Sequence, residues 1–343
     1  LPADNVDFSP NGQGVVMKKI VFVCESRDPC SWYRAQVPAA ELRRRGHDAS
    51  VVLKRDWSAC NQADVIVFER TSGLAAFEDL LQYKTAGKFV VYDLDDNIWN
   101  INPVNPASRY WANETPQGAV SISMRIADVV TVTTANLAGV VSKFNPNVAV
   151  IPNCLPDDKW NIERPDRETP VIGWAGSATH WGDLKLTSGV INQVLDEFPA
   201  VGLAVAGMPS YPFADSGRVE ILKPVKLEDY AALIARFDIG LAPLTDDSFN
   251  ACKSDLKFLE YAALGLSVIA SKVPAYSSSV ISGTNGFLAR NPKDWLKLLR
   301  RLLNDGCLRR EIGEAARAFA ETRFISKNIE SWEDALGLTT TVV

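Results

Sequence analysis

The amino-acid sequence predicts an α/β protein made of two doubly wound domains, and three observations support this expectation. Short apolar, β-branched runs alternate with longer segments of helical period, which is typical of parallel sheets covered by helices. The chain has 343 residues, whereas a single hydrophobic core usually stops growing at roughly 250 to 300 residues. A stretch rich in proline and charge, residues 156–170, separates two series of such runs and is typical of an interdomain linker.

In the first series, the apolar run at residues 19–24 is the first expected strand. A helix is expected at residues 33–45, where Pro38 is compatible only with the first turn and Gly46 ends the helix. Thr134 is placed to cap a later helix whose apolar residues fall on one face. The other expected strands are residues 48–53, 65–69, 89–92, 128–133 and 148–151.

The second series follows the linker and ends in a helical third. Its expected strands are residues 171–174, 202–206, 219–222, 239–244 and 267–270. Its expected helices are residues 184–198, 227–237, 254–264, 292–304, 307–322 and 327–336. Because both series alternate strands with helices, ligands are expected at the carboxyl ends of the strands.

Composition narrows the class of protein. Hydrophobic residues make up 47% and charged residues 22% of the chain, and no apolar run approaches the roughly 18 residues that span a bilayer. The formal net charge of −5 gives no general attraction for nucleic acid or anionic lipid. Six cysteines show neither C-x2-C metal spacing nor the density of a disulfide scaffold, which favours a reducing, cytoplasmic location.

The strongest functional signal is residues 250–271, NACKSDLKFLEYAALGLSVIAS. Backbone amides at the start of its helix, with Lys253, Ser254 and Lys257 on the same segment, attract a diphosphate through the helix dipole and direct charge. Glu260, two turns further on, is placed to accept hydrogen bonds from sugar hydroxyls. The stretch therefore predicts a binding site for a ligand that carries a diphosphate and sugar hydroxyls.

This stretch resembles the donor-site signature of GT-B glycosyltransferases, in particular family four, the glycosyltransferases group 1. The family pattern E-A-x-A-x-G-x-P-V-I-A compares here with residues 260–270, EYAALGLSVIA, and Glu260 matches the glutamate that contacts the donor ribose. The resemblance runs from about Lys18 to Leu336 and implies two Rossmann-like domains facing each other across a cleft. The family's earlier glutamate, seven positions before Glu260, is replaced by Lys253, which is expected to serve the phosphates instead.

Two further segments resemble the family in the same order. Residues 148–160 are similar to the end of its N-terminal domain, and residues 171–184 are similar to the opening strand and loop of its C-terminal domain. The basic pair that many members carry after this strand is absent, and Ser177 and His180 stand there as donor-binding candidates. His180 has an equally good interpretation as an ordinary loop histidine packed near Trp181.

The resemblance implies a division of the chain. We expect residues 1–17 to be an N-terminal extension and residues 18–165 to form a Rossmann-like domain on the acceptor side. Residues 166–325 are expected to form the Rossmann-like domain that binds the nucleotide sugar. Residues 326–343 are expected to form a C-terminal helix and tail that pack back toward the N-terminal domain.

Charged residues in the first half complete the candidate site. Arg34 follows the first strand and is expected to reach a donor phosphate, with a solvated arginine at a helix start as the alternative. Asp93, Asp95 and Asp96 follow a buried strand and are the candidate catalytic residues, and Asp95 or Asp96 is expected to orient or deprotonate the acceptor. Asp93 and Asp95 also form the D-x-D pattern with which GT-A glycosyltransferases hold a metal. The GT-B resemblance favours no essential metal, and Asp93 has a structural alternative as a loop cap.

The expected activity is transfer of a sugar from a UDP- or GDP-type nucleoside diphosphate sugar to a hydroxyl group. The resembled family implies retention of anomeric configuration, and the acceptor is left open between a glycan, a lipid, a protein and a modified nucleobase. Two alternatives remain. One is an inactive or regulatory nucleotide-sugar-binding protein, favoured by the lysine at position 253. The other is a nucleotide-sugar epimerase, which needs acid and base groups that His47 and His180 barely supply.

Overall fold

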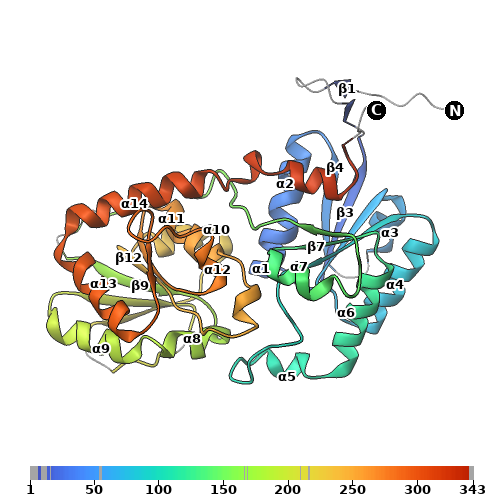
Figure 1. Ribbon diagram of the computed structural model, residues 1–343. Coiled ribbons are helices and arrows are strands. Elements are labelled where there is room, and N and C mark those ends of the chain that lie inside the picture. Colours follow the sequence, from blue (N-terminus) through green and yellow to red (C-terminus); the bar gives the residue numbers. More distant parts are fainter. Residues whose placement is uncertain are drawn as a thin grey trace. The chain divides into compact units, whose positions relative to one another are not determined.

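The computed structural model describes residues 7–8, 14–15, 17–53, 56–165, 167, 169–208, 210–214 and 217–339. Most of the expected N-terminal extension lies outside these residues. The chain divides into two compact units, each with its own six-stranded sheet (Figure 1). The first domain takes the described residues of Leu1–Trp99, Tyr110–Cys154 and Ile325–Val343, and the second takes those of Asn100–Arg109 and Leu155–Phe324. The predicted pair of Rossmann-like domains is confirmed.

The sheet of the first domain is wholly parallel, in the order β4-β3-β5-β6-β7-β8. Its strands are β3 (Lys19–Cys24), β4 (Asp48–Leu53), β5 (Val65–Glu69), β6 (Phe89–Leu94), β7 (Val129–Val132) and β8 (Val148–Val150), and β1 (Asp7–Phe8) pairs separately with β2 (Gly14–Val15). Its longer helices are α2 (Val37–Arg44), α3 (Trp57–Gln62), α4 (Leu74–Thr85), α6 (Glu114–Ile126), α7 (Ala135–Val141) and α15 (Glu330–Ala335). Short turns of helix are α1 (Pro29–Ser31), α5 (Ser108–Trp111) and η4 (Ile325–Lys327).

The sheet of the second domain is also wholly parallel, in the order β11-β10-β9-β12-β13-β14. Its strands are β9 (Val171–Ala175), β10 (Gly202–Ala206), β11 (Val219–Leu222), β12 (Ile239–Ala242), β13 (Ser267–Ser271) and β14 (Phe287–Ala289). Its helices are η2 (Ala178–His180), α8 (Trp181–Lys185), α9 (Ser188–Glu197), α10 (Leu227–Ile234), η3 (Asn250–Cys252), α11 (Leu256–Ala263), α12 (Pro274–Ser277), α13 (Pro292–Asn304) and α14 (Gly306–Glu321).

The predicted strands are all present, and the differences concern helices, the edge strand β14 and the short pair β1 and β2. The strand β14 and the helices α3, α4 and α6 were not predicted from the sequence. The helix expected at residues 184–198 is two helices, α8 and α9. The first helix also differs, because a π-helical turn, η1 (Trp32–Gln36), precedes α2. The Val37 N–H donates to the Trp32 carbonyl five residues back, and this wider turn accommodates Pro38, which has no N–H to donate.

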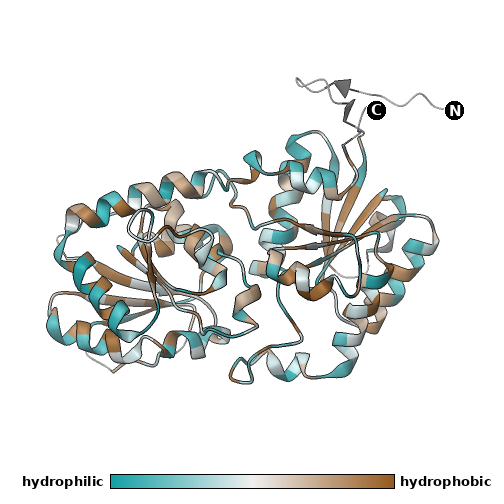
Figure 2. Ribbon diagram, in the orientation of Figure 1, coloured by the Kyte–Doolittle hydropathy of each residue, from teal (hydrophilic) through white to brown (hydrophobic). Residues whose placement is uncertain are grey.

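Each domain has a core of its own around its sheet. Figure 2 shows apolar strands in both sheets and helices with polar outer faces. In the first domain, Phe22 of β3 contacts Trp332 of α15 edge to face, with ring centroids 5.7 Å apart. The end of the chain therefore contributes directly to the first core. None of the described helices is both long and apolar enough to cross a membrane.

Candidate functional site

Each sheet reverses its strand order at one place, and ligands of doubly wound proteins bind at the carboxyl ends of the strands there. In the first domain the reversal falls between β3 and β5, and in the second between β9 and β12. We call these places the first and the second switch point. The loops that follow these four strands define the candidate site in each domain.

At the second switch point a buried carboxylate joins the two loops. Asp183, 7% exposed, contacts the His180 Nδ1 atom through Oδ2 at 2.8 Å. Its Oδ1 atom accepts from the Thr245 backbone N–H at 2.8 Å and from the Asn250 side-chain amide at 3.0 Å. Burial opposes the charge of Asp183, but the hydrogen bonds from His180 and Thr245 outweigh it and lower its pKa. The loops after β9 and β12 are thus held together by one anion.

The imidazole of His180 is kept neutral in this arrangement. Burial lowers its pKa, and the positive charges of Lys253 and Lys257 lower it further, while Asp183 opposes them. An Nδ1–H that donates to Asp183 leaves Nε2 as an acceptor for a ligand hydroxyl. His180 is therefore part of the hydrogen-bond network of the candidate site. It also lies in the loop segment after β9, where the alternative interpretation expected an ordinary histidine.

Two glycines bring the loops after β9 and β10 together. Gly207 has a φ of +84°, and a Cβ atom there would clash with the carbonyl oxygen of Gly176. A Cβ atom on Gly176 would in turn clash with the ring of Trp174. The backbone at this edge is therefore bare, which is how doubly wound proteins let a phosphate or nucleotide approach main-chain amides.

The segment with the donor-site signature enters the same edge. The structure resolves the expected helix 254–264 into η3, a short connection and α11. Lys253 lies on this connection with its Nζ 4.4 Å from the centroid of the Phe249 ring. Glu260 is buried on α11 and accepts a hydrogen bond from the Tyr230 hydroxyl at 3.0 Å. Ser254, beside Lys253, is partly exposed.

Lys257 has a different environment from Lys253. Its ammonium donates to the carbonyl oxygen of Ala175 and lies 5.1 Å from the Trp174 ring centroid. Burial lowers its pKa, which Glu260 and Asp183 partly offset. The structure therefore brings Lys257 to the predicted edge, where it supports the loop after β9. Ser177 lies in that loop and shares a hydrogen bond with the Thr179 hydroxyl at 2.6 Å.

A pocket of about 730 Å³ opens on the same edge of the second sheet, around the ends of β12, β13 and β14. Thr245, which donates to Asp183, lines it together with Ser271, Lys272 and Asn291. The second switch point is therefore continuous with a space large enough for a ligand.

In the first domain, Arg34 and Asp93 form a buried pair. The Arg34 Nε and Nη2 atoms donate to the two Asp93 oxygens at 3.0 and 2.6 Å, and each residue is at most 1% exposed. Arg34 Nη1 donates to the Ile151 carbonyl at 2.7 Å, and Thr131 donates to Asp93 at 2.6 Å. This arrangement differs from the expectation that Arg34 reaches a phosphate and that Asp93 is catalytic. Both side chains form their hydrogen bonds with other residues of the first domain.

The first switch point is acidic and is organised by Arg70. This residue has a φ of 43°, the only positive φ of a non-glycine residue among those described. Its guanidinium lies 3.3 Å from Asp95 and 3.5 Å from Asp28, which follows β3. Asp96, next to Asp95, is partly exposed at the same edge. A strained backbone that presents a charged side chain is common at ligand sites.

Glu69 at the end of β5 was not identified from the sequence, and neither was Arg70. Glu69 is 4% exposed, and burial first, then the negative charge of Asp95, raises its pKa to about 8. It is therefore protonated at neutral pH and can donate a hydrogen bond. The sequence does contain a signal for these two residues. In VIVFER, residues 65–70, a glutamate and an arginine come at the end of an apolar strand.

Comparisons with known proteins agree with this geometry. Residues 169–305 match the family model described as Glycosyl transferases group 1. A comparison with curated protein sequences finds no significant match.

Solved structures match over nearly the whole chain. HepE from Anabaena in complex with UDP and glucose has a TM-score of 0.68 and 15% identity, covering 92% of this chain and 99% of that chain. Sucrose-phosphate synthase from Thermosynechococcus elongatus has a TM-score of 0.65 and 13% identity, covering 92% and 98%. A glycosyltransferase from Rickettsia africae has a TM-score of 0.62 and 14% identity, covering 93% and 97%.

These matches confirm the predicted GT-B fold and identify the group 1 domain at residues 169–305, which contains the second switch point. The chain has the GT-B fold, and its residues 169–305 match the Glycosyl transferases group 1 family.

Proposed function

We propose that the protein transfers a glycosyl group from a nucleoside diphosphate sugar, of the UDP type, to a hydroxyl group of an acceptor. The observation that carries this proposal is the second switch point. There a neutral histidine, a buried aspartate, bare glycine loops and the lysine-bearing segment 253–260 converge within the family-matched domain. The HepE structure, which holds UDP and glucose, supports the choice of donor.

In the proposed donor complex, Lys253 and the amides near Ser254 oppose the negative charge that grows on the departing diphosphate. Glu260, the fifth residue of α11, binds the ribose hydroxyls. Ser177 and His180 contact the phosphates or the sugar from the loop after β9. Lys257 holds that loop by its bond to Ala175 and thereby positions the other groups.

The acceptor is proposed to bind at the first switch point. Asp96 orients the acceptor hydroxyl, and Asp95 is held for the same purpose by Arg70 at 3.3 Å. Arg34 and Asp93 hold the end of β6 in place without touching substrate. Retention is proposed from the family resemblance, with the departing phosphate accepting the proton of the acceptor.

A metal bound by Asp93 and Asp95 does not fit the observed contacts. Both oxygens of Asp93 accept hydrogen bonds from Arg34, and Asp95 pairs with Arg70. A divalent cation needs several oxygen ligands that face one point, and two cations already occupy these carboxylates. We therefore propose a reaction without an essential metal.

The test combines transfer and donor binding. UDP affinity is measured by calorimetry, and transfer from UDP-sugars to glycan, lipid, protein and DNA acceptors is screened, each with and without a chelator. Asp96→Asn should lower transfer at least 100-fold and leave UDP affinity within twofold, because an amide keeps the shape but loses the charge and the base. Loss of UDP binding in both the chelated and the Asp96→Asn samples would instead support a metal site. UDP binding without transfer or donor hydrolysis would support the nucleotide-sugar-binding alternative.

A further inference from the structure

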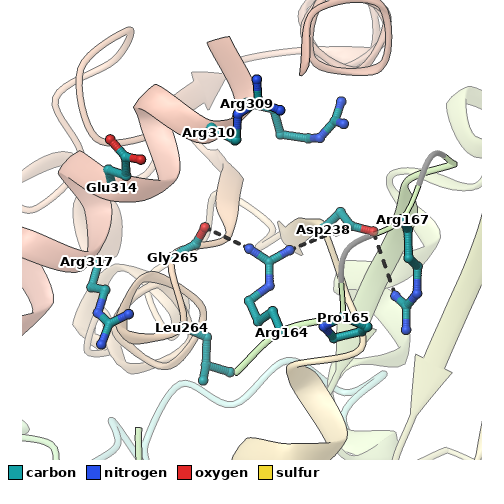
Figure 3. A pocket seen from close by; sticks show the side chains of 10 residues that line it. All are labelled: Arg164, Pro165, Arg167, Asp238, Leu264, Gly265, Arg309, Arg310, Glu314 and Arg317. Atoms are coloured by element: carbon teal, nitrogen blue, oxygen red, sulfur yellow. Dashed lines mark hydrogen bonds and ion pairs between the residues drawn. The ribbon is translucent and has the colours of Figure 1, made fainter. Parts of the chain in front are cut away.

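A second pocket, of about 330 Å³, lies at the amino ends of the strands of the second sheet. Asp238 directly precedes β12, and Leu264 and Gly265 form the turn before β13. The segment before β9 and the helix α14 provide the other walls (Figure 3). The second switch point lies at the opposite, carboxyl edge of the same sheet. Strands of four and five residues separate the two edges by about 13 to 17 Å.

Close backbone packing builds this pocket. Gly265 has a φ of +69°, and a Cβ atom on Gly313 of α14 would clash with the Gly265 carbonyl oxygen. The Ser267 hydroxyl donates to the Arg309 carbonyl oxygen and fixes α14 against the start of β13. Only glycine at position 313 lets the helix come this close. The arginines of α14 are therefore held at a fixed distance from those before β9.

Five arginines and two acids line the pocket: Arg164, Arg167, Arg309, Arg310, Arg317, Asp238 and Glu314. Asp238 is already fully engaged. Its Oδ1 accepts from Arg164 at 2.8 Å, and its Oδ2 accepts from the Val171 N–H at 2.8 Å and lies 3.8 Å from Arg167. If both acids are ionised, the lining side chains still carry three positive charges more than negative ones.

The positive charges act on one another. Burial lowers the pKa of Arg164, and the charges of Arg167 and Arg309 lower it further against the opposing effect of Asp238. Figure 3 shows Arg164 between the Gly265 carbonyl and Asp238, with α14 and its arginines on the other wall. Clustering cations around a partly buried guanidinium raises the free energy of the empty pocket, and an anion placed among them would relieve that repulsion.

Several guanidinium N–H groups remain for such an anion. Arg309 uses Nη1 for the Leu302 carbonyl at 2.6 Å, and Arg310 uses Nη2 for the Cys307 sulfur at 3.4 Å. Arg317 has its Nε 3.4 Å from a Glu321 oxygen, and both side chains of that pair are nearly half exposed. Each guanidinium has five N–H donors in a planar fork that matches the geometry of phosphate oxygens.

We propose that this pocket is a binding site for a small anion that carries two or more phosphate groups. Arginine is preferred for multidentate phosphate recognition, and the pocket volume is within the range of small-ligand sites. Three walls converge on one space, which suits a compact ligand better than an extended polyanion such as nucleic acid. The site is separate from the proposed donor site and does not depend on it.

The experiment measures binding of inorganic tripolyphosphate to the full chain by calorimetry, in the presence of excess UDP. The double variant Arg310→Gln/Arg317→Gln removes two charges from the pocket. The double variant Lys293→Gln/Lys297→Gln removes two charges from exposed positions on α13 and is the matched control. We expect the first variant to lose at least tenfold in affinity and the second to stay within twofold of wild type. Lys253→Ala should also bind tripolyphosphate as wild type does.

Four outcomes would overturn the proposal. Absence of tripolyphosphate binding would remove the site, and equal losses in the two double variants would reduce it to a general effect of charge. Displacement by UDP, with a loss in Lys253→Ala, would assign the anion to the donor site. Tighter binding of a single-stranded DNA oligonucleotide than of tripolyphosphate would indicate an extended nucleic-acid surface. Melting curves of all variants establish that each is folded.

Discussion

The two switch points of this protein share one architecture and differ in the charged residues that they gather. The first places Glu69, Asp95 and Asp96 around a single cation, Arg70. The second places Lys253 and Lys257 near two buried acids, Asp183 and Glu260. Under the proposed function, the edge with Asp95 and Asp96 receives the acceptor hydroxyl, and the edge with Lys253 receives the donor phosphates. The difference shows that strand order locates a binding site, while the residues directly after the strands decide what it binds.

The largest expected effect tests whether Asp93 belongs to the structure of the first domain and not to its chemistry. Asp93→Ala leaves the guanidinium of Arg34 buried without its carboxylate, which should lower the free energy of unfolding by about 3 to 5 kcal/mol. Thr131→Val is the control, because it removes only one neutral donor to Asp93 and should cost about 1 to 2 kcal/mol. Urea unfolding measures both. If both variants lost equally little free energy of unfolding, Asp93 would again be a candidate catalytic residue.

The next effect concerns the protonated state of Glu69. Its folded pKa of about 8 lies above its ordinary value of 4.5, so its contribution to stability is full at low pH and is lost as pH rises toward 8. Between pH 5 and 7 the wild type should lose about 2.5 kcal/mol of stability relative to Glu69→Gln, whose amide does not titrate. Denaturant unfolding at several pH values checks this. Parallel stability profiles for the two proteins would show that Glu69 titrates normally.

A third prediction sharpens the contrast at the second switch point. Lys253→Ala should weaken UDP binding roughly thirtyfold, about 2 kcal/mol, while binding of uridine changes little, because the ammonium is proposed to act on the phosphates. Lys297→Ala, an exposed lysine of the same domain, should leave both affinities unchanged. Calorimetry measures the affinity of each variant for UDP and for uridine. Equal losses for UDP and uridine would mean that Lys253 shapes the pocket without holding phosphate.

The smallest effect compares two glycines with positive φ, one in each domain. Gly87, with a φ of +78° and nothing near its would-be Cβ atom, should lose about 1 kcal/mol of stability as Gly87→Ala from backbone strain alone. Gly207→Ala adds a clash with the Gly176 carbonyl and should cost about 2 kcal/mol. It should also weaken UDP binding, which Gly87→Ala should not. Thermal melts and UDP titrations measure both effects, and indistinguishable variants would show that the two loops adapt freely.

The sequence predicted those parts of the fold and site that depend on local pattern. Apolar runs located the long buried strands, and Lys257 of the predicted segment contacts the carbonyl of Ala175 at the carboxyl end of β9. The edge strand β14 was missed because its apolar run has only three residues, whereas β8, which is equally short, lies in the four-residue apolar run 148–151. Arg34 and Asp93 are 59 positions apart in the sequence, and no local sequence pattern predicts a contact between residues so far apart. Glu69 escaped notice because a strand-ending acid acquires a raised pKa only through burial in the assembled sheet.

The return of the chain's last helix to the first domain has a consequence for the order of assembly. The second domain is almost entirely one continuous stretch, whereas the first core needs Ile329, Trp332 and Leu336 from the far end of the chain. Arg45 adds ion pairs to Glu330 and Glu333 at 2.7 and 3.1 Å. On the ribosome, the domain that is synthesised first is therefore completed last. Until Trp332 has been synthesised, Phe22 lacks its edge-to-face contact and this part of the first core stays incomplete, which favours aggregation of the partly made domain.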